Sequence, residues 1–571
     1  GSDAQRDRIL QVIVEAYLAL LADSGGSVAN ETFHAADAVR GRTVERALAE
    51  SSARAGAGDR VLADLVRHEQ DAEKQVAALQ GLLTNMLTQP SSEQDPGAVT
   101  ALRQQIDQLR GARARVREEI EKRFPSYAQL IDPRPATVEE VQKNLRPGEA
   151  LIATYVGDQR LFVWAVPQQG AVAFASTKIT GREVFRMVQG LRKSLDADVQ
   201  SIEQVPAFDL ATANKLCAML LQPVAAGWSG AHSLMIVPHR SLGQIPFGLL
   251  VTEPVSSAAD GGVPFAGYQK VPFLIRKVAV NQLPSVAALA TLRSIAAAKT
   301  ARQMFAGFGD PWFNAQQAKE ARGAGGVLQT RGAPKTAQLQ TRGISLVRRS
   351  VPAEAAANAT LASLPRLPDT ADEVRSIALA LHADPAKDVF LGAQASEKNA
   401  TSGALAKRRI IVFATHGLVP GDLGGLTQPA LALSSPAVAG GGGDGLLTVE
   451  KILGLKLDAD WVVLSACNTA AGQGAGTEAV SGLGRAFFYA GTRALLVSNW
   501  PVETLSARTL TTDLFKRIAD NPDLPRAEAL RQAELALIDG PGAVDPDTKQ
   551  TLFSYAHPLF WAPFTLVGDG G

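Results

Sequence analysis

The sequence predicts an α/β protein in which two tandem units, each an α/β/α sandwich of three layers, follow an N-terminal helical arm. From about residue 150 onward, short runs of Val, Ile, Leu and Ala alternate with amphipathic stretches, as in sheets covered by helices. Residues 3–125 instead repeat apolar side chains at three- and four-residue steps. At roughly 100–200 residues per domain, 571 residues suggest about three domains. We therefore expect domains at 1–145, 146–300 and 301–571.

The N-terminal arm is expected to contain two long amphipathic helices. Two apolar stripes are separated by Pro90-Ser91-Ser92 and Pro96-Gly97, which favour a turn. The stripes comprise Leu65, Ala72, Val76, Leu79, Leu83 and Met86, and then Leu102, Ile106, Leu109, Val116 and Ile120. Helices joined by a short polar turn pack as an antiparallel hairpin that hides both stripes. The arm is therefore predicted to pack or to bind a partner, and it shows no catalytic cluster.

The pattern changes after Pro147-Gly148, where the first α/β unit begins. A β-hairpin is expected around the turn dipeptide Gly157-Asp158. Its strands are Ala150–Val156 and Leu161–Val166, followed by helices near Arg182–Leu195 and Ala211–Leu221 and by strands at Ser233–Val237 and around Phe273–Val280.

A second series of strands and helices starts at Met304. Expected strands are Met304–Gly309, Val389–Leu391, Ile410–Ala414, Trp461–Ser465 and Ala494–Asn499, and expected helices are Asp372–Leu381, Thr477–Tyr489, Leu505–Ile518 and Arg526–Ile538. Ligands of such sheets bind at the carboxyl ends of parallel strands, so the residues after these runs are candidate site residues.

The segment 312–360 differs from its surroundings. It is rich in Gly, Ala and Gln, has no convincing periodicity, and carries an excess of basic over acidic residues. It also repeats five residues, Leu328–Gly332 and Leu339–Gly343. We expect a flexible insertion, and the sharper alternative is an exposed segment that a protease cleaves.

Composition excludes several classes of protein. The chain has 57 Lys and Arg against 56 Asp and Glu, which gives no electrostatic reason for nucleic-acid or membrane binding. Two cysteines allow neither a disulfide framework nor a zinc knuckle, and no apolar run reaches the roughly 18 residues of a membrane span. Because the chain starts with Gly1-Ser2 and not with Met, we expect residues upstream in the natural protein. The default expectation is a cytoplasmic location, with a removed signal as the alternative.

Two predicted strands end in reactive residues. The strand at 410–414 leads into His416, and the strand at 461–465 leads into Cys467. If these strands are parallel neighbours, both residues face one cleft. His416 precedes Cys467 by 51 residues, which matches the order and spacing of about 50 in caspases. An imidazole beside a thiol generates or holds the nucleophilic thiolate.

The residues beside this pair fit acyl transfer through a thioester. The backbone N–H groups of Gly417 and Cys467 are candidate donors of an oxyanion hole, each typically worth about 2.7–4 kcal/mol. Cys217 lies in a helical pattern among Leu216, Met219 and Leu220, so we expect a packed, inert thiol there.

Several motifs together resemble the CHAT family of caspase- and separase-like proteases, over about residues 145–571. They are Ala414–Gly417, Leu464–Thr469, Gly482–Phe487, Ser498–Val502, Leu234–Pro238 with Ile245–Phe247, Leu367–Thr370 with Glu373, and Trp561–Phe564. The resemblance implies that both units have a caspase-like fold and that His416 and Cys467 are the catalytic dyad. It also implies a first unit without its own dyad, which agrees with the sequence because no cysteine complements His239. Members of this family often follow tetratricopeptide repeats, which are not evident here.

Specificity requires a residue that recognises the side chain before the scissile bond. Glu503 follows the strand at 494–499, and a carboxylate there would pair with a substrate Arg or Lys. The alternative is that Glu503 is only an exposed loop acid or a helix-start acid, and Asp422 is a weaker rival for the pocket. An acidic pocket would make Arg331 and Arg342 of the repeated segment candidate self-cleavage sites.

No cofactor is expected. Gly307-Phe308-Gly309 lacks the third glycine of a dinucleotide site, no Walker lysine follows a glycine loop, and His416 and Cys467 lack further metal ligands nearby. The sequence therefore predicts a cysteine endopeptidase that cleaves proteins or peptides after a basic residue, regulated by self-cleavage or by a partner bound to the arm. The alternative is a non-catalytic scaffold that binds partner proteins through its helices.

Overall fold

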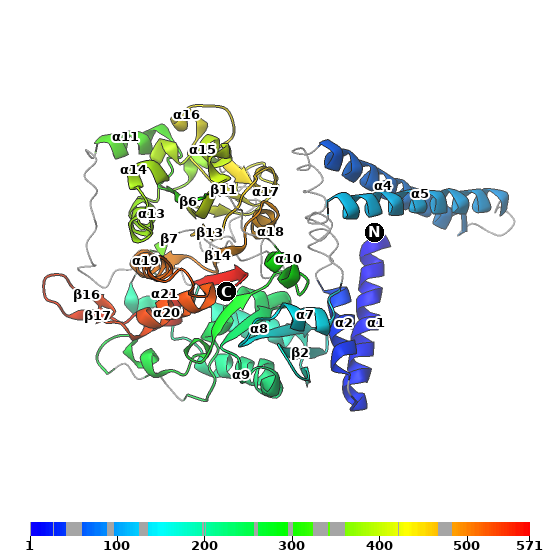
Figure 1. The fold of residues 1–571 in the computed structure, drawn as a ribbon, viewed down its shortest axis with the longest axis horizontal. Coiled ribbons are helices and arrows are strands. Elements are labelled where there is room, and N and C mark those ends of the chain that lie inside the picture. The colour runs from blue at the N-terminus through cyan, green and yellow to red at the C-terminus, as the bar shows by residue number, and fades with distance from the viewer. Residues whose placement is uncertain are drawn as a thin grey trace. The chain divides into compact units, whose positions relative to one another are not determined.

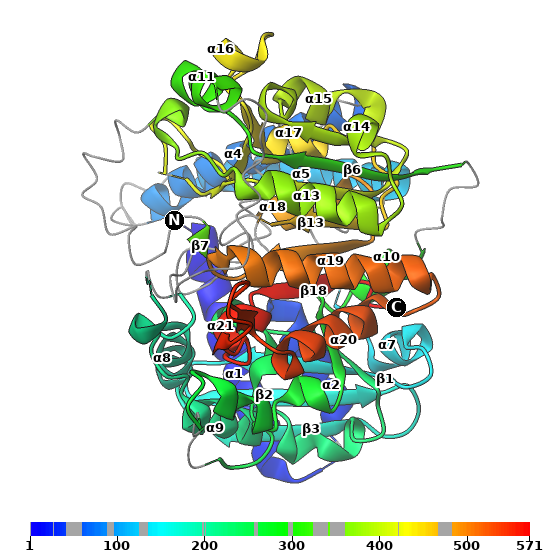
Figure 2. The same ribbon diagram turned by 90° about the vertical axis from the view of Figure 1, so that its left-hand side faces the viewer.

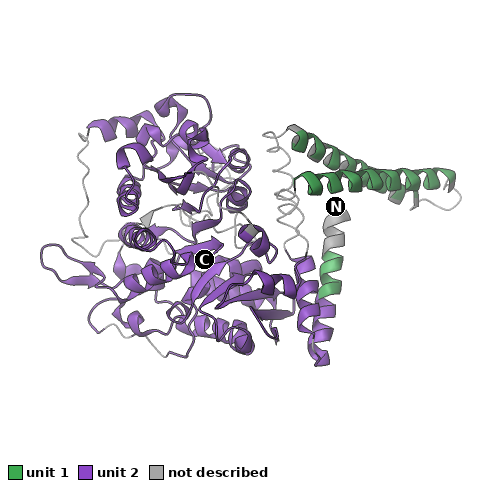
Figure 3. Cartoon of the chain, in the orientation of Figure 1, with its two compact units in different colours: residues 1–14, 41–134 green, residues 15–40, 135–571 purple. Residues whose placement is uncertain are grey.

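The structure is a computed structural model that describes residues 2–26, 28–40, 60–87, 96–124, 135–196, 199, 201–255, 258, 261–294, 301–323, 341–342, 360–420, 422–465 and 482–571. The chain forms two compact units (Figure 3). One comprises Gly1–Val14 and Gly41–Arg134, and the other comprises Glu15–Arg40 and Pro135–Gly571.

The first unit contains the predicted helical hairpin. Helices α4 (Arg60–Leu87) and α5 (Pro96–Arg123) lie against each other (Figure 1). Val76, Ile106 and Ile120 of the predicted stripes are buried. Glu69 also joins the two helices, because it accepts hydrogen bonds from Nε of Arg113 at 2.7 Å and Nε of Arg117 at 2.9 Å.

The second unit also includes helical residues from the region before 146. Helix α2 (Ala29–Val39) and the end of α1 (Ser2–Ser24) belong to it, together with α7 (Val138–Asn144). Trp164 donates a hydrogen bond to Thr32 at 3.0 Å, and Arg160 pairs with Asp23 at 2.6 Å. The structure thus divides the expected arm of residues 1–145 between the two units.

The α/β unit is built on one sheet of eleven strands, in the order β3-β2-β1-β4-β5-β18-β14-β13-β9-β6-β8. In chain order the strands are β1 (Glu149–Val156), β2 (Arg160–Pro167), β3 (Ala173–Lys178), β4 (Ser233–Val237), β5 (Ala279–Gln282), β6 (Gln303–Gly309), β8 (Val389–Leu391), β9 (Arg408–Ala414), β13 (Trp461–Leu464), β14 (Ala494–Ser498) and β18 (Phe564–Gly568).

The sheet has two halves that run in opposite directions. Strands β8, β6, β9, β13 and β14 are mutually parallel, and so are β1, β4, β5 and β18. The halves meet where β14 pairs antiparallel with β18, with Leu496 opposite Leu566. The carboxyl ends of the β9 half and of the β4 half therefore lie at opposite edges of the sheet.

Helices cover both faces of the half of the sheet that contains β9. On β9, Val412 and Phe413 point to opposite faces, as neighbours in a strand do. The face of Phe413 carries α18 (Gly482–Tyr489), since the rings of Phe413 and Phe487 are 5.9 Å apart. The other face carries α13 (Asp369–Ala380) and α19 (Thr504–Asp520), and α20 (Arg526–Asp539) lies beside α19 over β5 and β18 of the other half (Figure 2). The half of the sheet that contains β4 has the further helices α8 (Gly181–Arg192), α9 (Leu210–Leu220) and α10 (Ala288–Ser294). The predicted three-layer α/β class is confirmed.

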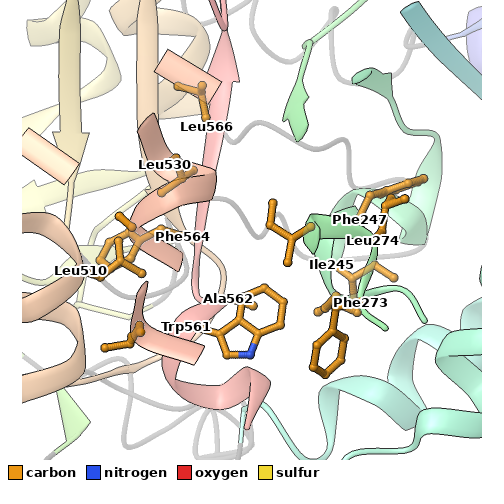
Figure 4. Packing of buried hydrophobic residues seen from close by; sticks show 14 of the residues in the cluster. Ile245, Phe247, Phe273, Leu274, Leu510, Leu530, Trp561, Ala562, Phe564 and Leu566 are labelled. Carbon is orange, nitrogen blue, oxygen red and sulfur yellow. The ribbon is translucent and has the colours of Figure 1, made fainter. Parts of the chain in front are cut away.

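One hydrophobic core joins the two halves of the sheet. Its buried residues come from the expected first unit, such as Ile245 and Phe273, and from the second, such as Leu510 and Trp561 (Figure 4). The rings of Phe273 and Trp561 meet edge to face at 5.1 Å. The predicted limits of the two α/β units, 146–300 and 301–571, remain a prediction. The residues within these two ranges share one sheet and one hydrophobic core.

Two sequence expectations differ from the structure. The strand expected around Phe273–Val280 begins only at Ala279, because Leu274–Arg276 forms a 3₁₀ turn. The expected insertion at 312–360 contains a regular helix, α11 (Ala315–Gly323). It also contains a two-residue strand, β7 (Thr341–Arg342), and its other residues between 324 and 359 lie outside the described part.

Candidate active site

The carboxyl ends of β9 and β13 bring the two candidate catalytic segments to one edge of the sheet. These strands are parallel neighbours, as the dyad hypothesis requires, and Phe413 lies opposite Leu464. His416 comes three residues after Phe413, and Cys467 comes three residues after Leu464. Cys467 lies outside the described residues, whose last member on this strand is Ser465. The pairing of His416 with Cys467 thus stays a prediction.

The His416 side chain is held in one orientation. It is only 2% exposed, and its Nε2 lies 2.7 Å from the carbonyl oxygen of Pro365. Because a carbonyl only accepts hydrogen bonds, Nε2 must carry the proton. In the neutral ring this leaves Nδ1 as the basic nitrogen. Phe313 packs beside the ring, with a centroid separation of 5.6 Å.

Burial also sets the charge of His416. Loss of hydration lowers the pKa of its imidazole, while the hydrogen bond to Pro365 acts in the opposite direction and is the weaker of the two causes. The side chain is therefore neutral at neutral pH. A neutral imidazole whose Nδ1 carries no proton is the form that accepts a proton from a thiol.

The carbonyl of Pro365 is fixed by the sheet itself. The next residue, Arg366, donates to both carboxylate oxygens of Asp310, from Nε at 2.7 Å and from Nη2 at 2.6 Å. Asp310 directly follows β6, the strand beside β9, and its backbone N–H donates to Oγ1 of Thr370 at 2.7 Å. The segment that orients His416 is thus tied to the neighbouring strand by a two-pronged ion pair.

Gly417 begins β10 (Gly417–Leu418), which pairs antiparallel with β11 (Ala430–Ala432). The N–H of Ala432 donates to the carbonyl of His416 at 2.9 Å, so His416 and Ala432 form a hydrogen-bonded pair. Such pairs alternate along an antiparallel ladder, which makes Gly417 and Leu431 the non-hydrogen-bonded pair. The N–H of Gly417 is therefore directed away from β11, as an oxyanion donor would need to be.

A buried carboxylate fixes the end of β13. Glu373 of α13 is fully buried, and its Oε1 accepts a hydrogen bond from Oγ of Ser465 at 3.0 Å. Thr511 of α19 lies at 3.5 Å from the same oxygen. Ser465 precedes Cys467 by two residues and is the last described residue before it, so Glu373 anchors the end of β13 from which the segment with Cys467 leaves.

This role of Glu373 leads to a prediction. Glu373→Ala removes the acceptor of Ser465 and leaves a cavity, and we expect a loss of about 2–4 kcal/mol in the free energy of unfolding. Glu373→Gln keeps an acceptor oxygen and is expected to fold nearly as stably. If Glu373 acts by positioning Ser465, Glu373→Ala lowers kcat more than it changes KM for a peptide substrate, whereas Glu373→Gln, which keeps the acceptor oxygen, retains the kinetics of the parent. Equal kinetics of folded Glu373→Ala and the parent would contradict that role.

Glu503 lies at the edge of the sheet formed by the carboxyl ends of β9, β13 and β14, and its side chain caps helix α19. It is 4% exposed and caps α19, accepting the N–H of Leu505 at 3.1 Å and of Ser506 at 2.7 Å. Its position matches the helix-start alternative, although the residue is buried and not exposed. The role of Glu503 in a pocket for a basic substrate side chain stays a prediction.

The other specificity and cleavage residues are less defined. Asp422 is half-buried, and its Oδ2 accepts the N–H of Val419 at 2.8 Å, which closes a turn. Arg331 lies outside the described residues. Arg342 lies in β7, which pairs with β15 (Val502–Glu503).

Two residues outside the dyad behave as structural groups. Cys217 of α9 is 2% exposed, and burial raises the pKa of its thiol to about 11, so it is not a nucleophile at neutral pH. His239 is buried at the end of β4. It stacks on Tyr155 at 4.5 Å, and its Nδ1 accepts the N–H of Val156 at 3.0 Å.

Two surveys of the described residues bear on ligands and membranes. No three His, Cys, Asp or Glu side chains come together there as a metal site would require. Over the same residues, every helix is too short or too polar to cross a lipid bilayer.

The sequence matches the CHAT domain over residues 210–569, more than half of the chain. The chain belongs to the CHAT domain family. Among curated proteins, tetratricopeptide repeat protein 28 of Mus musculus is 28% identical over 124 residues, which is 22% of this chain and 4% of that protein. The chain thus spans only a small part of that relative.

Two kinds of solved protease are among the structures similar to this CHAT protein. The separase of the Saccharomyces cerevisiae separase–securin complex is 8% identical, covers 87% of this chain and 38% of its own, and gives a TM-score of 0.39. The Arg-specific cysteine proteinase gingipain R is 9% identical, covers 68% of this chain and 74% of its own, and gives a TM-score of 0.31. The chain spans less than half the length of separase.

Proposed function

We propose that this CHAT protein is a cysteine endopeptidase that uses Cys467 as the nucleophile and His416 as the base. The observation that carries the proposal is the environment of His416. Its ring is neutral, is held by Pro365 in one tautomer, and lies at the end of the strand beside the one that leads to Cys467.

The reaction follows from these groups. Nδ1 of His416 takes the proton of the Cys467 thiol, and Sγ attacks the carbonyl carbon of the peptide bond. The backbone N–H groups of Gly417 and Cys467 stabilise the oxyanion. When the intermediate collapses, the C–N bond breaks and the imidazolium gives its proton to the leaving amine. Water, deprotonated by His416, then hydrolyses the thioester and restores the thiol.

A peptide library tests this reaction directly. The parent chain and Cys467→Ala are incubated with the same library, and the products are read by mass spectrometry. Cleavage by the parent but not by Cys467→Ala supports the proposal and also reports the residue before the scissile bond. Identical product spectra would contradict it.

We further propose that the residue before the scissile bond is Arg or Lys, recognised by Glu503. Glu503→Gln removes the charge and keeps one acceptor oxygen for the cap of α19, where Glu503 uses one oxygen for the N–H of Leu505 and the other for that of Ser506. We expect kcat/KM for a peptidyl-Arg substrate to fall about 10- to 100-fold, the range for one charge-assisted hydrogen bond, and the lost cap bond to lower the free energy of unfolding by about 1 kcal/mol. The matched variant Asp422→Asn tests the rival carboxylate. If kcat/KM falls in neither variant, an acidic pocket at these positions is contradicted.

Self-cleavage within the repeated segment is part of the same proposal. A pocket for basic residues would accept Arg331 and Arg342, which lie in two copies of the sequence Leu-Gln-Thr-Arg-Gly. We expect the purified chain to produce fragments that end at one of these residues, and the double variant Arg331→Ala/Arg342→Ala to remain intact. The fragments are identified by gel and mass spectrometry. Unchanged fragmentation of the double variant would contradict these sites.

Regulation and the scaffold alternative complete the proposal. We propose that a protein partner bound through the helical unit of α4 and α5 controls the peptidase. A full rate in the purified chain, with no response to any candidate partner, would contradict this control. A scaffold would bind the partner equally well but would hydrolyse no peptide.

A further inference from the structure

Strand β7 from the repeated segment is paired with β15. The ladder is antiparallel, with Arg342 opposite Val502 and Thr341 opposite Glu503. Figure 2 shows β7 beside the beginning of α19, which β15 directly precedes. β15 also follows β14, and β14, β13 and β9 are parallel. The ladder thus belongs to the sheet edge at which His416 lies.

The segment that leads into β15 is anchored on its other sides. The carbonyl of Asn499 accepts a hydrogen bond from Nη2 of the buried Arg192 at 3.0 Å. Nδ2 of Asn499 donates to Oγ1 of Thr565 at 2.7 Å, and Nε1 of Trp500 donates to the carbonyl of Leu559 at 3.1 Å. With the cap that Glu503 supplies to α19, these bonds hold β15 in an extended conformation.

An extended strand of this kind is a ready template for a peptide. Its main-chain N–H and C=O groups recognise any extended segment, while side-chain pockets beside it select among sequences. The chain's own Thr341–Arg342 makes this pairing in the structure. Its register sets Glu503 against Thr341 and not against Arg342, so the register that aligns Arg342 with Glu503 lies one residue away.

We propose that β15 is the docking strand for extended peptides and that Thr341–Arg342 occupies it as an internal competitor. The inference rests on the proposed function, because the peptides that dock there would be the substrates. A tethered competitor acts at an effective concentration set by the length and stiffness of its linkers, so it lowers the apparent affinity for a free peptide without any further contact. Release of the segment, by cleavage or by a partner, then opens the strand.

The internal repeat supplies a matched control for the test. Leu328–Gly332 and Leu339–Gly343 have the same five residues, and the ladder with β15 involves the second copy. Thr341→Pro removes a backbone N–H and disfavours strand pairing, and Thr330→Pro makes the same change in the same local sequence. Arg342→Gly is a second variant that weakens the strand without proline.

The experiment uses the full chain with Cys467→Ala, so that no peptide is cleaved. A fluorescein-labelled peptide Leu-Gln-Thr-Arg-Gly is titrated, and its Kd is measured by fluorescence anisotropy. We expect Thr341→Pro and Arg342→Gly to lower the Kd about tenfold or more, and hydrogen exchange of the Val502 and Glu503 amides to become faster when no peptide is present. Thr330→Pro is expected to change neither.

Two outcomes would overturn the proposal. One is an unchanged Kd in both Thr341→Pro and Arg342→Gly, and the other is an equal gain in Thr330→Pro. Because the assay measures binding in Cys467→Ala, its result does not depend on catalysis. A parent chain that hydrolyses no peptide would instead contradict the proposed function and leave the binding result intact.

Discussion

Replacing Cys467 with Ala is expected to lower kcat/KM for a peptidyl-Arg substrate by about 10⁴-fold or more. The reason is that no other group can form the thioester, since water without a nucleophile attacks the peptide bond far more slowly. The matched variant is Cys217→Ala, whose thiol is buried and protonated at neutral pH. We expect it to retain activity and to lose only about 1–2 kcal/mol of stability, because a small group leaves the core.

Hydrolysis is measured by release of a fluorophore from the substrate, and folding of both variants is checked by circular dichroism. A Cys467→Ala protein that is folded and still active would show that the reaction does not proceed through this thiol. Loss of activity only in Cys217→Ala would contradict the assignment of Cys467 as the nucleophile.

Replacing His416 with Ala is expected to lower kcat/KM by about 10²- to 10⁴-fold, the usual contribution of a general acid and base. His382→Ala is the matched control, because His382 is exposed and lies outside the site. Activity of His416→Ala equal to that of the control would contradict the assigned role.

The same residue predicts the pH dependence of the parent enzyme. Burial lowers the pKa of His416 from its ordinary value near 6.5, so the neutral, basic ring persists as the pH falls below that value. The acidic limb of kcat/KM is therefore expected below pH 6.5. A limb above pH 6.5, measured against pH with the parent chain, would show that the buried ring does not govern proton transfer.

Much of the fold follows from local sequence. The runs that became β4, β9 and β13 are short and apolar except at the first residues of β4 and β9, as is typical of strands covered on both faces. The position of β18 could not be predicted in the same way. Its pairing with β14 on one side and β5 on the other depends on contacts between segments that are far apart in the sequence, which no local pattern encodes.

The candidate site shows the same division. His416 was predictable because a polar residue ends a buried strand, and the parallel pairing with β13 then brings the next strand end to the same edge. The hydrogen bond from His416 to the carbonyl of Pro365 could not be predicted, because every residue has a backbone carbonyl and the sequence does not show which one is used. Glu373 had a signal, since it follows Leu367–Thr370 in the family-like motif, but its contact with Ser465 required the fold.

Glu503 shows why a residue near a site is harder to interpret. A carboxylate just before a helix predicts a cap, and a carboxylate at a strand end of this sheet predicts a ligand. The structure shows the cap directly, through the N–H groups of Leu505 and Ser506. The variant Glu503→Gln, which removes the charge, is needed to separate recognition of a basic substrate side chain from the capping of α19.

Covalent labelling tests the central claim most directly. The parent chain, His416→Ala and Cys467→Ala are treated with a peptidyl-Arg electrophile, and the modified residue is mapped by mass spectrometry. The account predicts labelling of Cys467 in the parent, none of Cys217, and loss of the label in both variants. Absence of label on Cys467 in the parent, with and without cleavage of the repeated segment, would contradict the account and favour a scaffold.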